Sequence, residues 1–198
     1  MTHSQPTKRS IRPLLYLTAI FAGPIVLAWV LYQHPNFVKG KNSANGKLIH
    51  PPTEVTDLNL SDSHGHPLSI KNFQGHWTLL FNDKEHCDAY CQQMLFNMHQ
   101  IQIATGKDRL RIQLALATTK QSLNTKLLTA INTKFNGTEI IIKATNTGKF
   151  AHKNFPMQPN NLYIIDPMGL VMMRYNKSIQ PMAIFNDVQR LLMASQIG

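Results

Sequence analysis

The sequence predicts an α/β fold in which helices cover both faces of a mixed central sheet. Short apolar runs without a 3.6-residue rhythm, typical of buried strands, alternate with longer segments whose apolar residues recur at helical spacing. The only two cysteines, Cys87 and Cys91, come just after one of these buried strands. The chain has 198 residues, enough for one domain of ordinary size and an additional segment, which lies at the N-terminus.

The additional segment is a charge-free apolar stretch, Leu14–Tyr32, close to the ~20 residues that span a bilayer. A cleaved signal peptide is the competing interpretation. The stretch is longer than a typical apolar core of ~7–15 residues, and no small-x-small cleavage site follows it. We therefore expect an uncleaved transmembrane helix over residues 14–32.

The basic residues around this stretch predict its orientation. Three of them precede the stretch closely, whereas three lysines follow it at a distance: Lys8, Arg9 and Arg12, then Lys39, Lys41 and Lys47. The positive-inside rule then makes residues 1–13 a cytoplasmic tail and places both cysteines outside the cytoplasm, where a disulfide persists.

Residues 33–54 are polar and rich in proline, glycine and asparagine, which predicts an extracytoplasmic tether. Residues 55–198 form the predicted domain. It begins with a hairpin, because Thr56–Leu60 and Pro67–Ile70 alternate around a glycine turn. His64 and His66 in that turn are interpreted as exposed turn residues rather than metal ligands.

The cysteine segment begins with Trp77–Phe81, an uncharged apolar run that predicts a strand buried on both faces. Turn formers and charges in Asn82–His86 end this strand. Apolar residues then recur at roughly helical spacing: Cys87, Tyr90, Cys91, Met94, Leu95, Met98, Ile101 and Ile103. The pattern predicts that both cysteines lie on the first turn of a helix.

This position is chemically special, because free amides and the helix dipole at an N-terminus lower a thiol pKa below its usual ~8.5. An i, i+4 pair directs two sulfurs the same way, for a disulfide if the first turn relaxes, or for one soft metal ion. We expect Cys87 to be the attacking thiol and Cys91 the resolving one. Asp88 opposes a thiolate at Cys87, and a charged His86 favours it. The alternative is two buried cysteines that act as small hydrophobic residues.

The remaining patterns predict alternating strands and helices. The expected elements are a strand at Leu110–Ala117, a helix at Gln121–Lys134, a strand at Glu139–Ala144, a short helix and loop at Asn146–Pro159, a hairpin of Leu162–Asp166 and Leu170–Tyr175, and a helix at Pro181–Gln196. This order is the thioredoxin-like arrangement, with the cysteine pair after the first central strand.

The formal net charge of +10 does not indicate nucleic-acid binding. Basic residues are scattered from Lys71 to Arg190 without a run or an aromatic-interleaved patch, and an outward-facing anchored protein does not meet the genome. We expect a basic surface that favours acidic protein partners or anionic lipid headgroups.

Several stretches together resemble a family of small bacterial membrane proteins associated with cytochrome c oxidase assembly, relatives of the Sco copper chaperones. They are the N-terminal anchor, Gly46–Pro52, Cys87–Cys91, Gly106-Lys107, Leu162–Tyr175 and Gln189–Gly198. The resemblance covers nearly the whole chain. It implies a location in the bacterial inner membrane, with the domain in the periplasm.

Sco proteins bind copper through a C-x-x-x-C pair and a distant histidine, and they serve the binuclear copper site of oxidase subunit II. Cys87 and Cys91 match the pair, and His152 is the nearest histidine to the loop before Leu162. The resemblance therefore implies Cu(I) bound by Cys87, Cys91 and His152. Asp88 and Gln92 stand where Sco proteins carry prolines.

Two functions remain open at this point. In the first, the protein is a tethered assembly factor for cytochrome c oxidase whose cysteine pair performs thiol–disulfide chemistry and handles Cu(I), a thiol–disulfide oxidoreductase rather than a conventional enzyme. In the second, a non-catalytic thioredoxin-like module with a structural disulfide docks onto an oxidase subunit or another assembly factor. Other candidate third copper ligands are His86, Met94 and Met98, although methionines at helical spacing more often fill a core.

Overall fold

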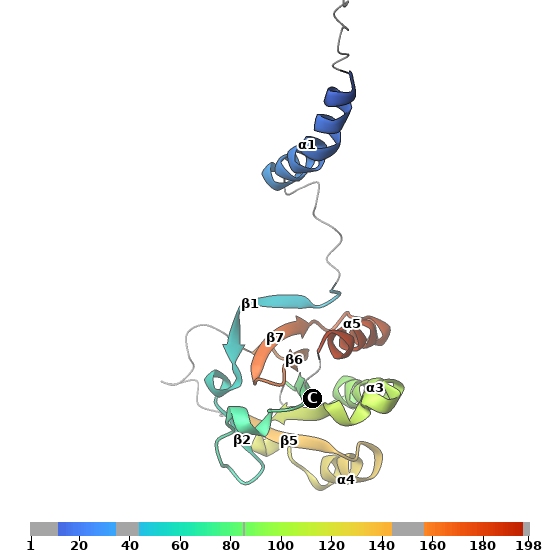
Figure 1. Ribbon diagram of the computed structural model, residues 1–198. Helices are drawn as coiled ribbons and strands as arrows, with labels where there is room; N and C mark the ends of the chain where they lie inside the picture. The colour runs from blue at the N-terminus through green and yellow to red at the C-terminus, as the bar shows by residue number, and fades with distance from the viewer. Residues whose placement is uncertain (1–11, 35–43, 85, 144–156, 196–198) are drawn as a thin grey trace, which may run out of the picture. The chain divides into compact units, whose positions relative to one another are not determined.

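The computed structural model describes residues 12–34, 44–84, 86–143 and 157–195 (Figure 1). The chain divides into two units, Met1–Ser43 and Ala44–Gly198. Each unit is described by itself below.

In the described part of the first unit, residues 12–34, the chain forms the helix α1, which spans Arg12–Gln33. Within it, Leu15–Gln33 is long and apolar enough to cross a membrane, in agreement with the expected span at 14–32. Its large apolar side chains are exposed, which suits a helix that is surrounded by lipid. The helix is the candidate membrane anchor.

The second unit is built on a seven-stranded mixed sheet in the order β1-β7-β6-β3-β4-β5-β2. The parallel pairs are β3–β4 and β4–β5, and all other neighbours are antiparallel. The strands are β1 (Lys47–Glu54), β2 (Leu60–Asp62), β3 (Trp77–Asn82), β4 (Ile112–Thr118), β5 (Thr138–Lys143), β6 (Asn161–Ile165) and β7 (Leu170–Tyr175).

Among the described residues of the second unit, three α-helices accompany the sheet: α3 (Ala89–Ala104), α4 (Thr125–Lys134) and α5 (Pro181–Ala194). Short 3-10 turns fill four of the connections: η1 (Val55–Leu58), η2 (Ile70–Asn72), η3 (Gly106–Arg111) and η4 (Lys120–Ser122). The prediction of a mixed α/β fold is confirmed.

The central strand β3 is buried on both faces, as predicted. Leu79 and Phe81 pack into the core cluster that includes α3, α4 and α5, whereas Leu80 packs into the cluster on the opposite face. Figure 1 shows the three helices on the same side of the sheet. In the part of the domain that the structure describes, the other face is covered by η1, η2 and their loops, with Val55 and Phe73 buried, and not by the expected second helical layer.

The edge strand β1 occupies residues 47–54, which the sequence assigned to the tether. It pairs antiparallel with β7, and the register shifts between Leu48 and Thr53. Pro51 and Pro52 made this segment look like a loop rather than a strand in the sequence. An edge strand tolerates them, because the N–H groups on its outer side need no partner within the sheet.

Two helices begin later than predicted because side chains cap them, and one strand also begins later because a 3-10 turn precedes it. Helix α3 begins at Ala89 rather than Cys87, and α4 begins at Thr125 after the N-cap Asn124, whose side chain accepts from Leu127 N–H. Leu110 is an exposed residue of η3, so β4 starts two residues later than predicted. Most of the predicted short helix at 146–159 lies outside the described residues.

The predicted N-terminal hairpin is reduced to a tight turn. Asp62 N–H donates to the His66 carbonyl at 2.9 Å, and Leu68 N–H donates to the Leu60 carbonyl at 2.8 Å. Strand β2 instead pairs antiparallel with β5. His64 and His66 are exposed, and His66 pairs with Asp62, whose pKa the His66 side chain lowers to about 2. This is the structural turn role expected for the two histidines.

Candidate functional site

A disulfide joins Cys87 to Cys91, with the two Cα atoms 5.0 Å apart. Cys87 lies in the loop between β3 and α3, and Cys91 lies in the first turn of α3. The prediction that both cysteines are helical is wrong for Cys87, since the helix starts two residues after it. That extended entry gives the chain the freedom to bring the two sulfurs together, which a regular i, i+4 turn would not.

Asp88 between the two cysteines is the N-cap of α3. Its backbone is extended, and its Oδ1 accepts from Cys91 N–H at 2.9 Å. This bond satisfies one of the free amides of the first turn, and the helix dipole stabilises the carboxylate at this position. Asp88 therefore has a defined structural role at the start of α3.

The two sulfurs differ in their accessibility. Cys91 is 0% exposed and belongs to the helical core cluster, whereas Cys87 is half-buried and packs against that cluster. A partner from solution can therefore approach Cys87 and not Cys91. This asymmetry is what an attacking and a resolving cysteine require.

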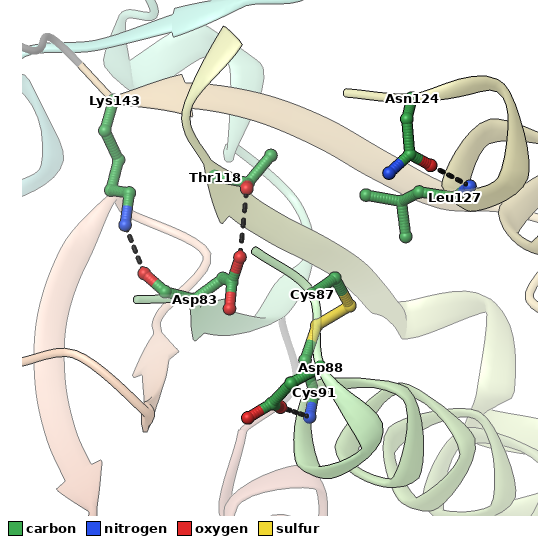
Figure 2. Close-up of a disulfide and its surroundings, with 8 residues drawn as sticks. All are labelled: Asp83, Cys87, Asp88, Cys91, Thr118, Asn124, Leu127 and Lys143. Atoms are coloured by element: carbon green, nitrogen blue, oxygen red, sulfur yellow. Dashed lines mark hydrogen bonds between the residues drawn. A yellow bond between two sulfur atoms is a disulfide. The ribbon is translucent and has the colours of Figure 1, made fainter. Parts of the chain in front are cut away.

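Asp83, one residue beyond β3, anchors the loop that carries Cys87. Its N–H donates to the Ala117 carbonyl at 2.9 Å, and its Oδ2 accepts from Thr118 Oγ1 at 3.1 Å. Lys143 Nζ donates to its backbone carbonyl. Figure 2 shows Asp83, Thr118 and Lys143 beside the disulfide. The start of the cysteine loop is thereby fixed to the ends of β4 and β5.

The Asp83 carboxyl is 1% exposed, and this burial raises its pKa above the ordinary value of 3.8. The Thr118 hydrogen bond and the Lys143 charge act in the opposite direction without cancelling the effect of burial. Sequence reasoning treated Asp83 only as a turn former. An acidic residue directly after a buried strand was the signal that could have identified it.

Tyr90 holds the start of α3 against the loop before α5. Its hydroxyl donates to the Lys177 carbonyl at 3.4 Å, and Lys177 Nζ lies 4.6 Å from the ring centroid. The ring also meets Phe81 edge-on at 6.0 Å. Burial and the charge of Asp88 raise the pKa of Tyr90, so it stays a neutral hydrogen-bond donor.

A groove of about 540 Å³ runs beside Cys87, between the start of α3 and α4. His86 and Cys87 line one side, and α4 lines the other from Thr125 to Lys134. Figure 2 shows Asn124 and Leu127, both lining residues, on the side toward which the Cys87 sulfur lies. The accessible member of the disulfide therefore faces a cavity large enough for part of a partner chain.

Within residues 12–34, 44–84, 86–143 and 157–195, no three His, Cys, Asp or Glu side chains cluster in a way that could hold a metal ion. Met94 and Met98 are buried in the core cluster, in line with the core-filling interpretation. His152 lies outside the described residues. The described donors are thus two sulfurs, which suit Cu(I) when reduced, and the exposed His86 in the same groove.

Known proteins resemble this chain in sequence and in fold. A family model described as "Transmembrane-like, thioredoxin-like, C-terminal domain" matches residues 77–195, which include the cysteine pair and every strand from β3 to β7. No curated protein matches the chain.

Solved structures share the fold at low sequence identity. Yeast Sco1 with copper bound is 15% identical, with a TM-score of 0.54, and the match covers 79% of this chain and 96% of that one. A Sco1/SenC family lipoprotein from Bacillus anthracis is 21% identical, with a TM-score of 0.51 over 73% of this chain and 99% of that one. The thioredoxin domain of a thiol-disulfide oxidoreductase from Bacteroides vulgatus is 12% identical, with a TM-score of 0.50 over 70% and 97%.

The chain therefore has the fold of Sco1 and of a Sco1/SenC family protein, and the prediction of a thioredoxin-like fold is confirmed. The family model covers more than half of the chain, from β3 to the end of α5. The protein belongs to the transmembrane-like, thioredoxin-like C-terminal domain family.

Proposed function

We propose that this protein is a membrane-tethered, Sco-like factor that performs thiol–disulfide exchange through Cys87 and Cys91. The observation that carries the proposal is the asymmetric disulfide after the central strand, with one sulfur half-buried beside a groove and the other fully buried. Ligands and partners of α/β sheets bind outside the carboxyl ends of the strands, and this is where the pair lies.

In the reducing direction, the Cys87 thiolate attacks a partner disulfide and forms a mixed disulfide, and one partner sulfur leaves as a thiolate. Cys91 then attacks the Cys87 sulfur, and the second partner thiolate is released. The two thiol protons of this protein end on the two partner sulfurs. The partner gains a dithiol, this protein gains the Cys87–Cys91 disulfide, and a dithiol reductant restores the pair.

Copper handling is a second part of the proposal. Reduced Cys87 and Cys91 would hold Cu(I), with His152 as the predicted third ligand. The bound Cu(I) ion would be the cargo that is transferred to a partner site, and the protein would contribute soft sulfur ligands. The copper-bound structure of yeast Sco1 supports this part through the shared fold. Titration of the reduced protein with Cu(I) against a competing chelator tests it, and binding that survives loss of both cysteines would refute it.

The proposed setting is the bacterial inner membrane, with residues 1–13 in the cytoplasm, residues 14–32 in the bilayer and the domain in the periplasm. The charge-free helix α1 and the basic residues before it support this setting. An anchored domain mainly meets partners at its own membrane face, and a cytochrome c oxidase subunit with an external copper site, or another assembly factor, fits that restriction. Labelling of an engineered cysteine before α1 by an impermeant reagent in spheroplasts tests the orientation, because a cytoplasmic tail stays unlabelled.

The test of the redox function is a cycle of reduction and reoxidation on the full-length protein in detergent micelles. The proposal expects the Cys87–Cys91 disulfide to be reduced by dithiothreitol and reformed by oxidised glutathione without loss of the fold. A pair that cannot be cycled refutes thiol exchange. In cells, deletion of the protein should lower assembled cytochrome c oxidase activity, with partial rescue by added copper or reductant.

The second candidate is a binding module whose disulfide is purely structural, and full burial of Cys91 favours it. A Cys87→Ser/Cys91→Ser variant separates the two functions. If the variant is as abundant as wild type and still supports oxidase assembly, the protein acts as a binding module. If it is abundant but inactive, thiol or copper chemistry is required.

A further inference from the structure

The charged side chains that line the groove beside Cys87 are basic. Its lining includes Lys126 and Lys134, both exposed residues of α4, and His86 on the opposite side. No aspartate or glutamate occurs among its described lining residues. Asp88 is close in sequence, but it is not a lining residue, and its carboxylate is bonded to Cys91 N–H.

The shape of the groove follows from one face of α4. Lys126, Thr129, Ala130, Thr133 and Lys134 recur at helical spacing, and all of them line the groove. The two lysines are about 12 Å apart along the helix axis, at a rise of ~1.5 Å per residue. Apart from Leu127, the lining residues between them are small, namely Thr129, Ala130 and Thr133, so they leave room for another chain. An extended peptide covers this distance with about four residues at ~3.3 Å each.

The accessible sulfur lies in the same groove. Cys91 is fully buried, so a thiol that attacks the disulfide must reach Cys87, a lining residue. The residues next to the partner's cysteine must then enter the groove. Two lysines without a carboxylate partner in the lining attract negative charge there.

We propose that this groove binds the cysteine-bearing segment of the partner in an extended form, and that this segment is acidic. The inference rests on the proposed thiol–disulfide function and adds the substrate class to it. The lysines of α4 bind and orient the acidic segment and take no part in bond making.

The exchange with a thiol peptide balances as follows. A peptide thiolate attacks Cys87 Sγ, the Cys87–Cys91 bond breaks, and its electron pair leaves on Cys91 Sγ, which takes a proton from water. A second peptide thiolate attacks the peptide sulfur of the mixed disulfide and frees Cys87. Two peptide thiols are oxidised to one disulfide, and the cysteine pair is reduced.

The test uses oxidised full-length protein in detergent micelles and three synthetic hexapeptides with one cysteine, flanked by aspartates, serines or lysines. The second-order rate constant for reduction of the disulfide is measured at equal peptide thiolate concentration, because the flanking charges change the thiol pKa. The proposal expects the aspartate peptide to react about five- to tenfold faster than the serine peptide, and the lysine peptide to react more slowly. Added salt should reduce this preference.

Two matched charge variants localise the effect. Lys126→Gln/Lys134→Gln should lower the aspartate peptide rate to that of the serine peptide, whereas the rate with dithiothreitol, whose attacking thiolate carries a single negative charge, should fall much less. Lys71→Gln/Lys107→Gln removes the same charge from exposed residues outside the groove and should leave all rates unchanged.

The outcomes distinguish the two proposals. If the three peptides react equally, or if both double variants act alike, the acidic-segment inference is overturned and thiol exchange stands. If dithiothreitol and all three peptides fail to reduce the disulfide, the thiol–disulfide function itself is refuted.

Discussion

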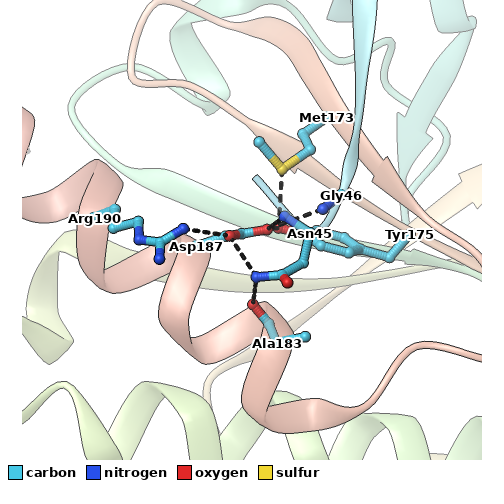
Figure 3. A network of polar contacts seen from close by, with 7 residues as sticks. All are labelled: Asn45, Gly46, Met173, Tyr175, Ala183, Asp187 and Arg190. Atoms are coloured by element: carbon cyan, nitrogen blue, oxygen red, sulfur yellow. Dashed lines mark hydrogen bonds and ion pairs between the residues drawn. The ribbon is translucent and has the colours of Figure 1, made fainter. Parts of the chain in front are cut away.

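The Tyr175 hydroxyl donates to Asp187 Oδ2 at 3.0 Å, which connects β7 to α5. The same carboxylate, 2% exposed, accepts from the backbone N–H groups of Asn45 and Gly46 at 2.8 and 3.0 Å and from Asn45 Nδ2 at 2.9 Å. Figure 3 shows the Asp187 network formed by these residues. Burial, followed by the Asp187 charge, raises the pKa of Tyr175, so the phenol remains a donor.

The Asp187 network should stabilise the start of the domain. Asp187→Ala leaves two backbone amides and a buried hydroxyl without their acceptor, and we expect it to lower the free energy of unfolding by about 3 kcal/mol. Tyr175→Phe removes one donor and should cost about 1 kcal/mol. Urea unfolding in micelles, followed by Trp77 fluorescence in a Trp29→Phe background, measures both. An Asp187→Ala variant within about 0.5 kcal/mol of wild type would contradict the role of the network.

Asp83 should make stability depend on pH. Because burial raises its pKa, the folded protein binds more protons at this carboxyl than the unfolded chain does between pH ~4 and the raised pKa. Stability therefore falls as pH rises through that window. Asp83→Asn removes this contribution, so the unfolding free energy of wild type minus that of the variant should decrease from pH 4 to pH 7. A difference that is constant or increases over this range would show that the folded carboxyl does not titrate as inferred.

Asp88 should have two separable effects, one through its hydrogen bond and one through its charge. Asp88→Ala removes the N-cap and should cost about 1 kcal/mol, whereas Asp88→Asn keeps an acceptor and should cost less. Both variants remove a negative charge beside Cys87, so both should speed alkylation of reduced Cys87 by iodoacetamide. Unfolding and alkylation are measured in a Cys91→Ser background, where unchanged alkylation in both variants would exclude the charge effect.

The two cysteines should differ in reactivity after reduction. Cys91→Ser leaves the half-buried Cys87, which should react with iodoacetamide in the native protein. Cys87→Ser leaves Cys91, which is 0% exposed and should react with iodoacetamide at least about tenfold more slowly than Cys87 does. Mass spectrometry follows the labelling, and urea should abolish the difference. Equal native rates would mean that Cys91 is accessible, and the assignment of attacking and resolving roles would then be wrong.

Structural features that depend on local sequence patterns were correctly predicted. The charge-free stretch gives α1, the apolar run Trp77–Phe81 gives β3, and the spacing of the cysteines permits their disulfide. The turn with Gly169 at φ 84° gives the β6–β7 hairpin. These features depend on solvent transfer, periodicity and turn geometry within a few residues, which a single chain displays directly.

Only the tertiary structure determined the features that join distant parts of the chain. Strand β1 exists because the edge of β7 offers hydrogen bonds to residues whose prolines predict a loop. Asn45 meets Asp187 across 142 positions of sequence, and Asp83 meets Thr118 across 35. The groove with its lysines forms because α3 and α4 follow parallel strands that end at the same edge of the sheet. Such contacts depend on where the sheet places its strands, and no local pattern of residues encodes that placement.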